Sequence, residues 1–138
     1  MRFVNWIFRV FRYTWAFPYS FVGLLLLLVA LLFGATVRIV DGTFEVAGGR
    51  LGAWMSRLPR SLQLSAITFD HVILGLDHAL LDSLRSHEQV HVRQYERWGI
   101  LFIPLYLGSS LLQFFRGRHP YFENRFEREA YTLDQLRD

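Results

Sequence analysis

Two histidines and a glutamate form the short motif HEQVH at residues 87–91. On a helix, side chains four positions apart lie on one face with Cβ atoms about 5–6 Å apart, so His87 and His91 can both reach one metal ion. Imidazole nitrogens bind zinc at about 2.0–2.1 Å. Glu88 borders the same face and is placed to act as general base on a metal-bound water. The spacing predicts a zinc site with His87 and His91 as ligands and Glu88 as the catalytic residue.

A catalytic zinc ion needs a third protein ligand and one open position. In metzincins the third ligand follows on the same stretch of chain, which needs glycine and histidine at positions 94 and 97. This chain has Gln94 and Arg97 there, so that class is excluded. A glutamate on a later helix is the common solution that remains. The C-terminal region offers three candidates, Glu123, Glu127 and Glu129.

The pairing of HEQVH with FEREAY, residues 126–131, resembles the gluzincin arrangement of zinc metallopeptidases, in which a second helix supplies a glutamate ligand. The site is most similar to those of the CAAX-prenyl-protease and HtpX membrane peptidases. This resemblance implies that Glu127 is the third zinc ligand and that Ala130 lets the two helices approach. The whole chain also resembles small bacterial membrane-anchored proteins with an HExxH motif.

The resemblance covers residues 84–138 and concerns the site, because those relatives have several transmembrane helices. The chain departs from them at Tyr131, which stands where an aspartate that orients the first histidine is expected. Asp134 or Glu123 is left for that task.

These residues predict a membrane-anchored zinc-dependent metallopeptidase that hydrolyses peptide bonds. His87, His91 and Glu127 would hold Zn²⁺, and the metal would lower the pKa of its water. Glu88 would take the proton as that water attacks the peptide carbonyl and return it to the leaving amine. The partners implied are a peptide or protein substrate and membrane lipid. The alternative is a non-catalytic membrane-anchored zinc-binding scaffold or regulatory protein.

Composition excludes several other classes. The chain has no cysteine, which excludes disulfides, thiolate zinc sites and cysteine nucleophiles. Five histidines with a single histidine-rich motif are too few for a di-iron lipid hydroxylase. The net charge of +3 comes from scattered arginines without a basic stripe, so no nucleic-acid partner is expected.

Several further side chains could stabilise an oxyanion during hydrolysis: Tyr95, Tyr121, Tyr131 and His119. Packing is the commoner role of a single tyrosine, and sequence spacing does not rank these residues. His71, in a predicted strand, and His78, at a predicted helix start, are expected to be ordinary satisfied or solvated residues.

Residues 1–37 predict a membrane anchor. Polar residues recur at three- and four-residue steps between Arg2 and Trp15, which indicates an amphipathic helix in the headgroup region. Residues 17–37 are almost wholly apolar and equal about 30 Å of helix, enough to cross a bilayer. A cleavable signal peptide is the alternative, disfavoured by the long aromatic flank. We predict a single-pass protein of the bacterial inner membrane, with the side of its domain left open by the arginine distribution.

Residues 38–138 are predicted to form a zincin-like metallopeptidase domain of the α+β class. Alternating β-rich runs around Asp41 and Gly42 predict a hairpin. Residues 64–75 predict one further strand of the same small antiparallel sheet. By analogy with zincins, that strand would lie beside the active-site helix and pair with extended substrate.

The remaining residues predict helices. Asp77 can cap the helix that carries HEQVH, and Gly99 can end it. Residues 50–61 predict a connector or short helix, and residues 124–137 a final polar helix.

The second apolar run, residues 100–115, equals about 24 Å of helix against a hydrocarbon thickness of about 30 Å. If it crossed the membrane once, HEQVH and Glu127 would lie on opposite sides and could not share a metal ion. The run is therefore expected to pack in the domain or to lie at the membrane surface.

Overall fold

The computed structural model describes residues 2–58 and 65–136. Within these ranges the chain is mixed α and β, which confirms the predicted α+β class. In chain order the elements are α1 (Arg2–Leu32), β1 (Thr36–Val40), β2 (Thr43–Ala47), α2 (Gly49–Ser56), β3 (Ala66–Phe69), β4 (Val72–Gly75), α3 (His78–Trp98), η2 (Gly99–Leu101), α4 (Phe102–Phe115) and α5 (Arg125–Gln135). Some of the predicted features lie partly outside the described residues. These are residues 59–61 of the connector, residue 64 of the strand, residue 137 of the last helix, and the side chains of Arg2 and Arg12.

Four strands form one sheet in the order β1-β2-β4-β3. The predicted hairpin is confirmed: β1 and β2 pair antiparallel, and Asp41 and Gly42 have φ angles of 50° and 79°, which suit a two-residue turn. The predicted single strand over residues 64–75 is wrong. Asp70 has a φ of 53°, which a short polar residue tolerates, and it turns the chain between antiparallel strands β3 and β4. β4 pairs parallel with β2, so the sheet is mixed, not antiparallel as predicted.

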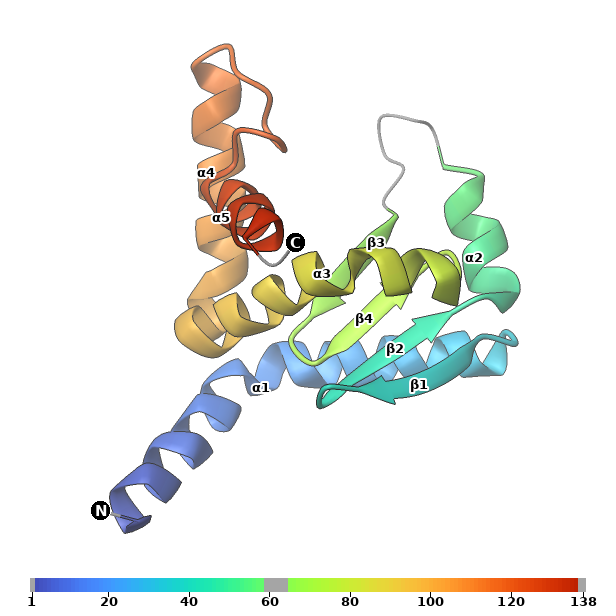
Figure 1. The fold of residues 1–138 in the computed structure, drawn as a ribbon, viewed down its shortest axis with the longest axis horizontal. Coiled ribbons are helices and arrows are strands. Elements are labelled where there is room, and N and C mark those ends of the chain that lie inside the picture. Colours follow the sequence, from blue (N-terminus) through green and yellow to red (C-terminus); the bar gives the residue numbers. More distant parts are fainter. Residues whose placement is uncertain (1, 59–64, 137–138) are drawn as a thin grey trace.

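The sheet lies between α1 on one face and α3 on the other (Figure 1). Successive side chains of a strand point to opposite faces, and the core divides accordingly. Val46, Val72 and Leu74 pack with Leu27 of α1. Ala47 and Ile73 pack with Leu81 and Val92 of α3. The two helices are thus fixed to a common support.

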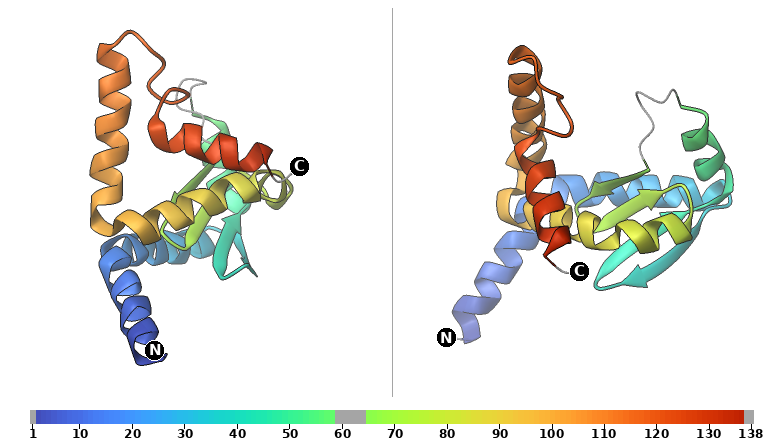
Figure 2. Two further views of the ribbon diagram at one scale, coloured as in Figure 1. Left: turned by 60° about the vertical axis from the view of Figure 1, so that its left-hand side comes forward. Right: turned by 45° about the horizontal axis from the view of Figure 1, so that its top comes forward.

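α1 is a single helix with Pro18 inside it and a bend between its two halves (Figures 1 and 2), where the sequence predicts an interfacial helix followed by a span to residue 37. It ends at Leu32, and Thr36 and Val37 already belong to β1. The second half of α1 lies along the sheet and does not stand apart from it. Gly23 makes this approach possible, because an added Cβ would lie 2.9 Å from the carbonyl oxygen of Phe69.

One helical stretch of the described residues, His78–Phe115, is long and apolar enough to cross a membrane. It comprises α3, η2 and α4, and its most apolar part is η2 and α4. The chain turns sharply between α3 and α4 (Figures 1 and 2). The apolar part of α1, Phe17–Leu32, is shorter. The helix that could cross by length and composition is therefore not the N-terminal one that the sequence predicts.

The predicted helix ends follow from capping residues. The side chain of Asp77 accepts a hydrogen bond from Leu80 N at 2.7 Å, and Gly99 follows the last residue of α3. The side chain of Asn124 accepts a hydrogen bond from Phe126 N at 2.9 Å and begins α5. These caps place α3 and α5 close to where the sequence predicts them.

Gly99 is the position where α3 gives way to the η2–α4 turn, with a φ of 53°. An added Cβ would lie 1.5 Å from Cδ1 of Trp15 in α1. We expect Gly99→Ala to lower the free energy of unfolding by about 2–5 kcal/mol through backbone strain and overpacking. Thermal unfolding in detergent micelles measures this. Gly108→Ala is the control, because nothing lies within 4 Å of its added Cβ. Equal stability of the two variants would contradict the expectation.

Candidate metal centre

α3 and α5 bring His87, His91 and Glu127 together, and all three side chains are buried. Nε2 of His87 lies 3.1 Å from Oε2 of Glu127. Nε2 of His91 lies 3.3 Å from Oε1 of the same carboxylate, and the two Nε2 atoms are 3.2 Å apart. The three predicted ligand residues thus converge on one point.

The dimensions of this triangle fit a small tetrahedral metal ion. Bonds of about 2.0–2.1 Å at tetrahedral angles place neighbouring ligand atoms about 3.3–3.4 Å apart. The two histidine nitrogens, and each histidine nitrogen with the carboxylate oxygen nearest to it, are 3.1 to 3.3 Å apart, just below this value. The two oxygens of Glu127 face different histidines. With one ligand atom from each residue, all three atoms lie within 4.8 Å of one another, so the group could hold a metal once the carboxylate turns one oxygen toward both histidines. Two imidazoles with a carboxylate are a donor set typical of zinc.

Close packing of α5 against α3 carries Glu127 to the histidines. Ala130, one turn further along α5, is fully buried, as expected of a small residue at a helix contact. Phe126 packs its ring against Phe102 and Trp98, with centroids 5.3 and 6.5 Å apart. These contacts on both sides of Glu127 fix the direction of its side chain.

Glu127 is held as a carboxylate. Burial alone would raise its pKa, but its contacts with His87, His91 and the Tyr106 hydroxyl outweigh burial and hold the pKa below its ordinary value. The Tyr106 hydroxyl donates to Oε1 of Glu127 at 2.6 Å. The sequence prediction missed Tyr106. The sequence carried one sign of this role, because Tyr106 is a polar residue within the apolar run at residues 100–115.

Glu88 is buried between α3 and the edge strand β3. The hydroxyl of Thr68 donates to Oε2 of Glu88 at 2.6 Å. The hydroxyl of Tyr95 donates to the carbonyl oxygen of Thr68 at 2.9 Å, which ties the same part of β3 to α3. Glu88 is not one of the three clustered ligands, so its carboxylate remains available beside them.

Gln94 orients the second histidine, a role that the sequence prediction missed. Its Oε1 accepts a hydrogen bond from Nδ1 of His91 at 2.8 Å. Its Nε2 donates to the Phe126 carbonyl oxygen and to Oε2 of Glu129, each at 3.1 Å. With the proton on Nδ1, the lone pair of His91 Nε2 points to the ligand cluster. Gln94 therefore fixes the tautomer of the ligand His91 and ties that ligand to α5.

We expect Gln94→Leu to weaken zinc binding about 10–100-fold, because side chains that orient ligands contribute that much to metal affinity. Competition with a fluorescent zinc chelator measures the affinity. Gln89→Leu is the matched control, since Gln89 lies on the same helix and donates to Thr43 instead. Equal affinities for the two variants would show that Gln94 does not orient the site.

His87 has no such orienting group in the described part of the chain, where its Nδ1 is buried without a hydrogen-bond partner. The ring of Tyr131 lies against it, with centroids 4.5 Å apart. Neither predicted substitute for the missing aspartate takes this place. Asp134 accepts a hydrogen bond from Ser86, and Glu123 forms an ion pair with Arg128 at 3.8 Å.

The other sequence candidates lie in different surroundings. Glu129 contacts Gln94 and pairs with Arg97 at 3.3 Å, so it is turned away from the ligand cluster. Tyr121 lies near the cluster. Burial and hydrogen bonding to Tyr131 raise its pKa, and the charge of Glu127 raises it further. His119 is exposed, and its Nδ1 accepts backbone hydrogen bonds within its own loop.

His71 and His78 make contacts with other residues, away from the ligand cluster. His71 lies 2.9 Å from Asp70 and 3.2 Å from Glu96. His78 lies 2.7 Å from the hydroxyl of Thr36. Both agree with the expectation of ordinary satisfied residues.

No protein-family model, characterised protein or solved structure matches this chain. The gluzincin resemblance therefore rests on the two sequence motifs.

Proposed function

We propose that this chain is a zinc-dependent metallopeptidase bound to a membrane. The observation that carries the proposal is the buried cluster of His87, His91 and Glu127, in which each histidine Nε2 lies 3.1 or 3.3 Å from a carboxylate oxygen, beside the buried Glu88. The exposed apolar side chains of α1 and α4 support membrane attachment.

In this proposal zinc, when bound, supplies a water of lowered pKa and polarises the peptide carbonyl. Glu88 takes the proton from the attacking water and gives it to the leaving amine. Thr68 holds Glu88 in place through its hydroxyl, at 2.6 Å. Tyr106 holds Glu127 so that both carboxylate oxygens stay directed at the histidines.

Three clustered ligands among the described residues favour catalysis over a purely structural metal, because structural zinc sites take four protein ligands. Burial favours the rival scaffold function: His87, Glu88, His91 and Glu127 are each no more than 7% exposed. An enzyme must open a path to this site, whereas a scaffold need not.

Removal of the metal tests the proposal. The full chain, purified in detergent and loaded with zinc, is expected to hold one zinc per chain and to cleave a mixture of fluorogenic peptides. Dialysis against a strong chelator should abolish both, and added zinc should restore both. The zinc content is measured by elemental mass spectrometry. Absence of zinc after loading would refute the metal site, and cleavage by the metal-free chain would refute the mechanism.

A further inference from the structure

α4 turns its polar side chains toward the protein. These side chains recur at three- and four-residue steps and form one stripe: Tyr106, Ser109, Ser110 and Gln113. Ser109 Oγ accepts a hydrogen bond from Arg125 N at 3.0 Å, and Ser110 Oγ accepts one from Asn124 Nδ2 at 2.7 Å. The stripe therefore faces the beginning of α5.

The opposite side of α4 is apolar and exposed. Its large side chains are 39 to 76% exposed: Leu105, Leu107, Leu111, Leu112, Phe114 and Phe115. A helix on the surface of a water-soluble protein has the reverse arrangement, with its apolar stripe facing the core. Polar residues turned inward and apolar residues turned outward are typical of a helix surrounded by lipid.

The second half of α1 has a similar apolar outer side. Gly23, Leu27 and Ala30 are buried against the sheet. Leu26 is partly buried against the same core, and the other residues between and after them are apolar and 38 to 84% exposed: Leu24, Leu25, Leu28, Val29, Leu31 and Leu32. Each helix thus has one side occupied by protein and another that no described residue covers.

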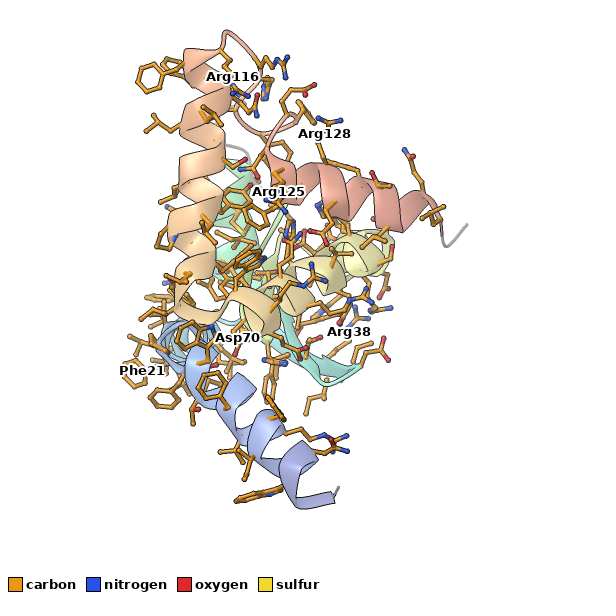
Figure 3. All side chains as sticks on the ribbon, turned by 90° about the vertical axis from the view of Figure 1, so that its left-hand side faces the viewer. Phe21, Arg38, Asp70, Arg116, Arg125 and Arg128 are labelled. Carbon is orange, nitrogen blue, oxygen red and sulfur yellow. The ribbon has the colours of Figure 1, made fainter. Side chains whose placement is uncertain are left out.

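These two exposed sides lie on the same side of the molecule. In Figure 1, α1 passes behind the sheet, and α5 lies in front of α4. In Figure 3, which shows the molecule from its edge, α4 and the second half of α1 lie along the left, with Phe21 on that side. Arg38, Arg125 and Arg128 lie on the other side. The outward residues of α4 and of Phe17–Leu32 form one surface, which we call the apolar face.

We propose that the apolar face rests on a lipid bilayer, with α4 and the second half of α1 lying in the plane of the membrane and neither crossing it. This inference rests on the proposed membrane attachment and is independent of the proposed hydrolysis. It differs from the single-pass anchor that apolar length alone predicts.

Two features argue against crossing. If α1 crossed, the sheet packed along its second half would enter the hydrocarbon together with Arg38 and Asp41, at a high free-energy cost for each charge. α4 is about 21 Å long at 1.5 Å per residue, shorter than the hydrocarbon thickness of about 30 Å. The chain beyond α4 must also return to α3 with Arg116, Arg118 and Glu123.

The charges around α4 favour lipid over a second protein as the covering partner. Arg116 and Arg118 follow α4 directly, are exposed, and form no ion pair with the described residues. Cations beside an apolar helix suit the phosphates of anionic lipids. A mostly apolar groove on the same helix, lined by Leu107, Ser110, Leu111, Phe114 and Pro120, can take an acyl chain of the bound leaflet.

Spin-label depth measurements test the inference, and the absence of cysteine allows single labels on the full chain. Labels would be placed at Leu101→Cys in η2 and Leu112→Cys in α4, and at Leu25→Cys and Leu32→Cys in α1. The protein would be reconstituted into vesicles of phosphatidylcholine and phosphatidylglycerol. Collision rates with oxygen, which enters lipid, and with an aqueous nickel chelate give the depth of each label.

We expect all four labels to meet oxygen more than nickel and to lie at similar shallow depths. Thr132→Cys on α5 is the control and should meet nickel. A crossing helix would instead separate the two α1 labels by about 10 Å in depth, or the two α4 labels by about 16 Å. That result would overturn the inference. Protection from both reagents, which indicates a covering protein or a second copy, would overturn it too, as would free access of nickel. Circular dichroism equal to that of the unlabelled chain shows that each variant is folded.

Discussion

Glu88→Gln is expected to lower peptide hydrolysis about 10²–10⁴-fold while leaving the bound zinc unchanged. Glutamine keeps the size of the side chain and can still accept the hydrogen bond from Thr68, which reaches Oε2 of Glu88 at 2.6 Å. It cannot accept the proton of the attacking water, and general-base catalysis contributes a factor of this size. Hydrolysis is measured with the fluorogenic peptide mixture, and zinc by elemental mass spectrometry on the same samples.

The matched control for this change is Glu96→Gln. Glu96 lies on the same helix, about two turns further on, and contacts His71 at 3.2 Å, away from the ligand cluster. It should retain both zinc and hydrolysis. If Glu88→Gln cleaved peptides as fast as the control, the catalytic role of Glu88 would be refuted and the scaffold function favoured.

Glu127→Ala is expected to remove most of the zinc and, with it, the hydrolysis. The carboxylate supplies one of the three clustered ligands, and its two oxygens lie 3.1 and 3.3 Å from the histidine nitrogens. Loss of a ligand should weaken binding by more than the about 10–100-fold typical of a residue that only orients one. Zinc affinity is measured by chelator competition.

Glu129→Ala and Glu123→Ala are the controls, because the sequence alone admits all three glutamates as ligands. Glu129 pairs with Arg97 and Glu123 with Arg128, so neither should change zinc affinity as strongly. Loss of zinc from Glu129→Ala with zinc retained by Glu127→Ala would reverse the assignment.

Local spacing made part of the site predictable. The four-residue step from His87 to His91 decides their common face on any helix, and Asp77 and Gly99 mark the ends of that helix. The approach of Glu127 follows from the gluzincin resemblance, since no local rule brings together residues 40 positions apart. Gln94 and Tyr106 escaped prediction because their roles depend on the packing of α5 and α4 against α3.

The fold was predictable where turn chemistry is strong. Asp41 and Gly42 mark a hairpin in any context, whereas Asp70 and His71 interrupt an apolar run that otherwise has the composition of one strand. The parallel pairing of β2 with β4 leaves no sequence signal, because it joins strands that are not neighbours along the chain. Hydropathy likewise does not distinguish a helix that crosses a bilayer from α1, which has a sheet on one side.

The separation of the ligands along the chain has a thermodynamic consequence. A metal held by His87, His91 and Glu127 would join α3 to α5 as a removable crosslink around α4, between residues 40 positions apart. A disulfide closing a loop of that length removes about 3–4 kcal/mol of unfolded-chain entropy. α4 lies inside this loop and carries part of the apolar face. Any coupling between ion binding and lipid binding through this loop would be reciprocal, so each ligand would change the affinity for the other by the same factor.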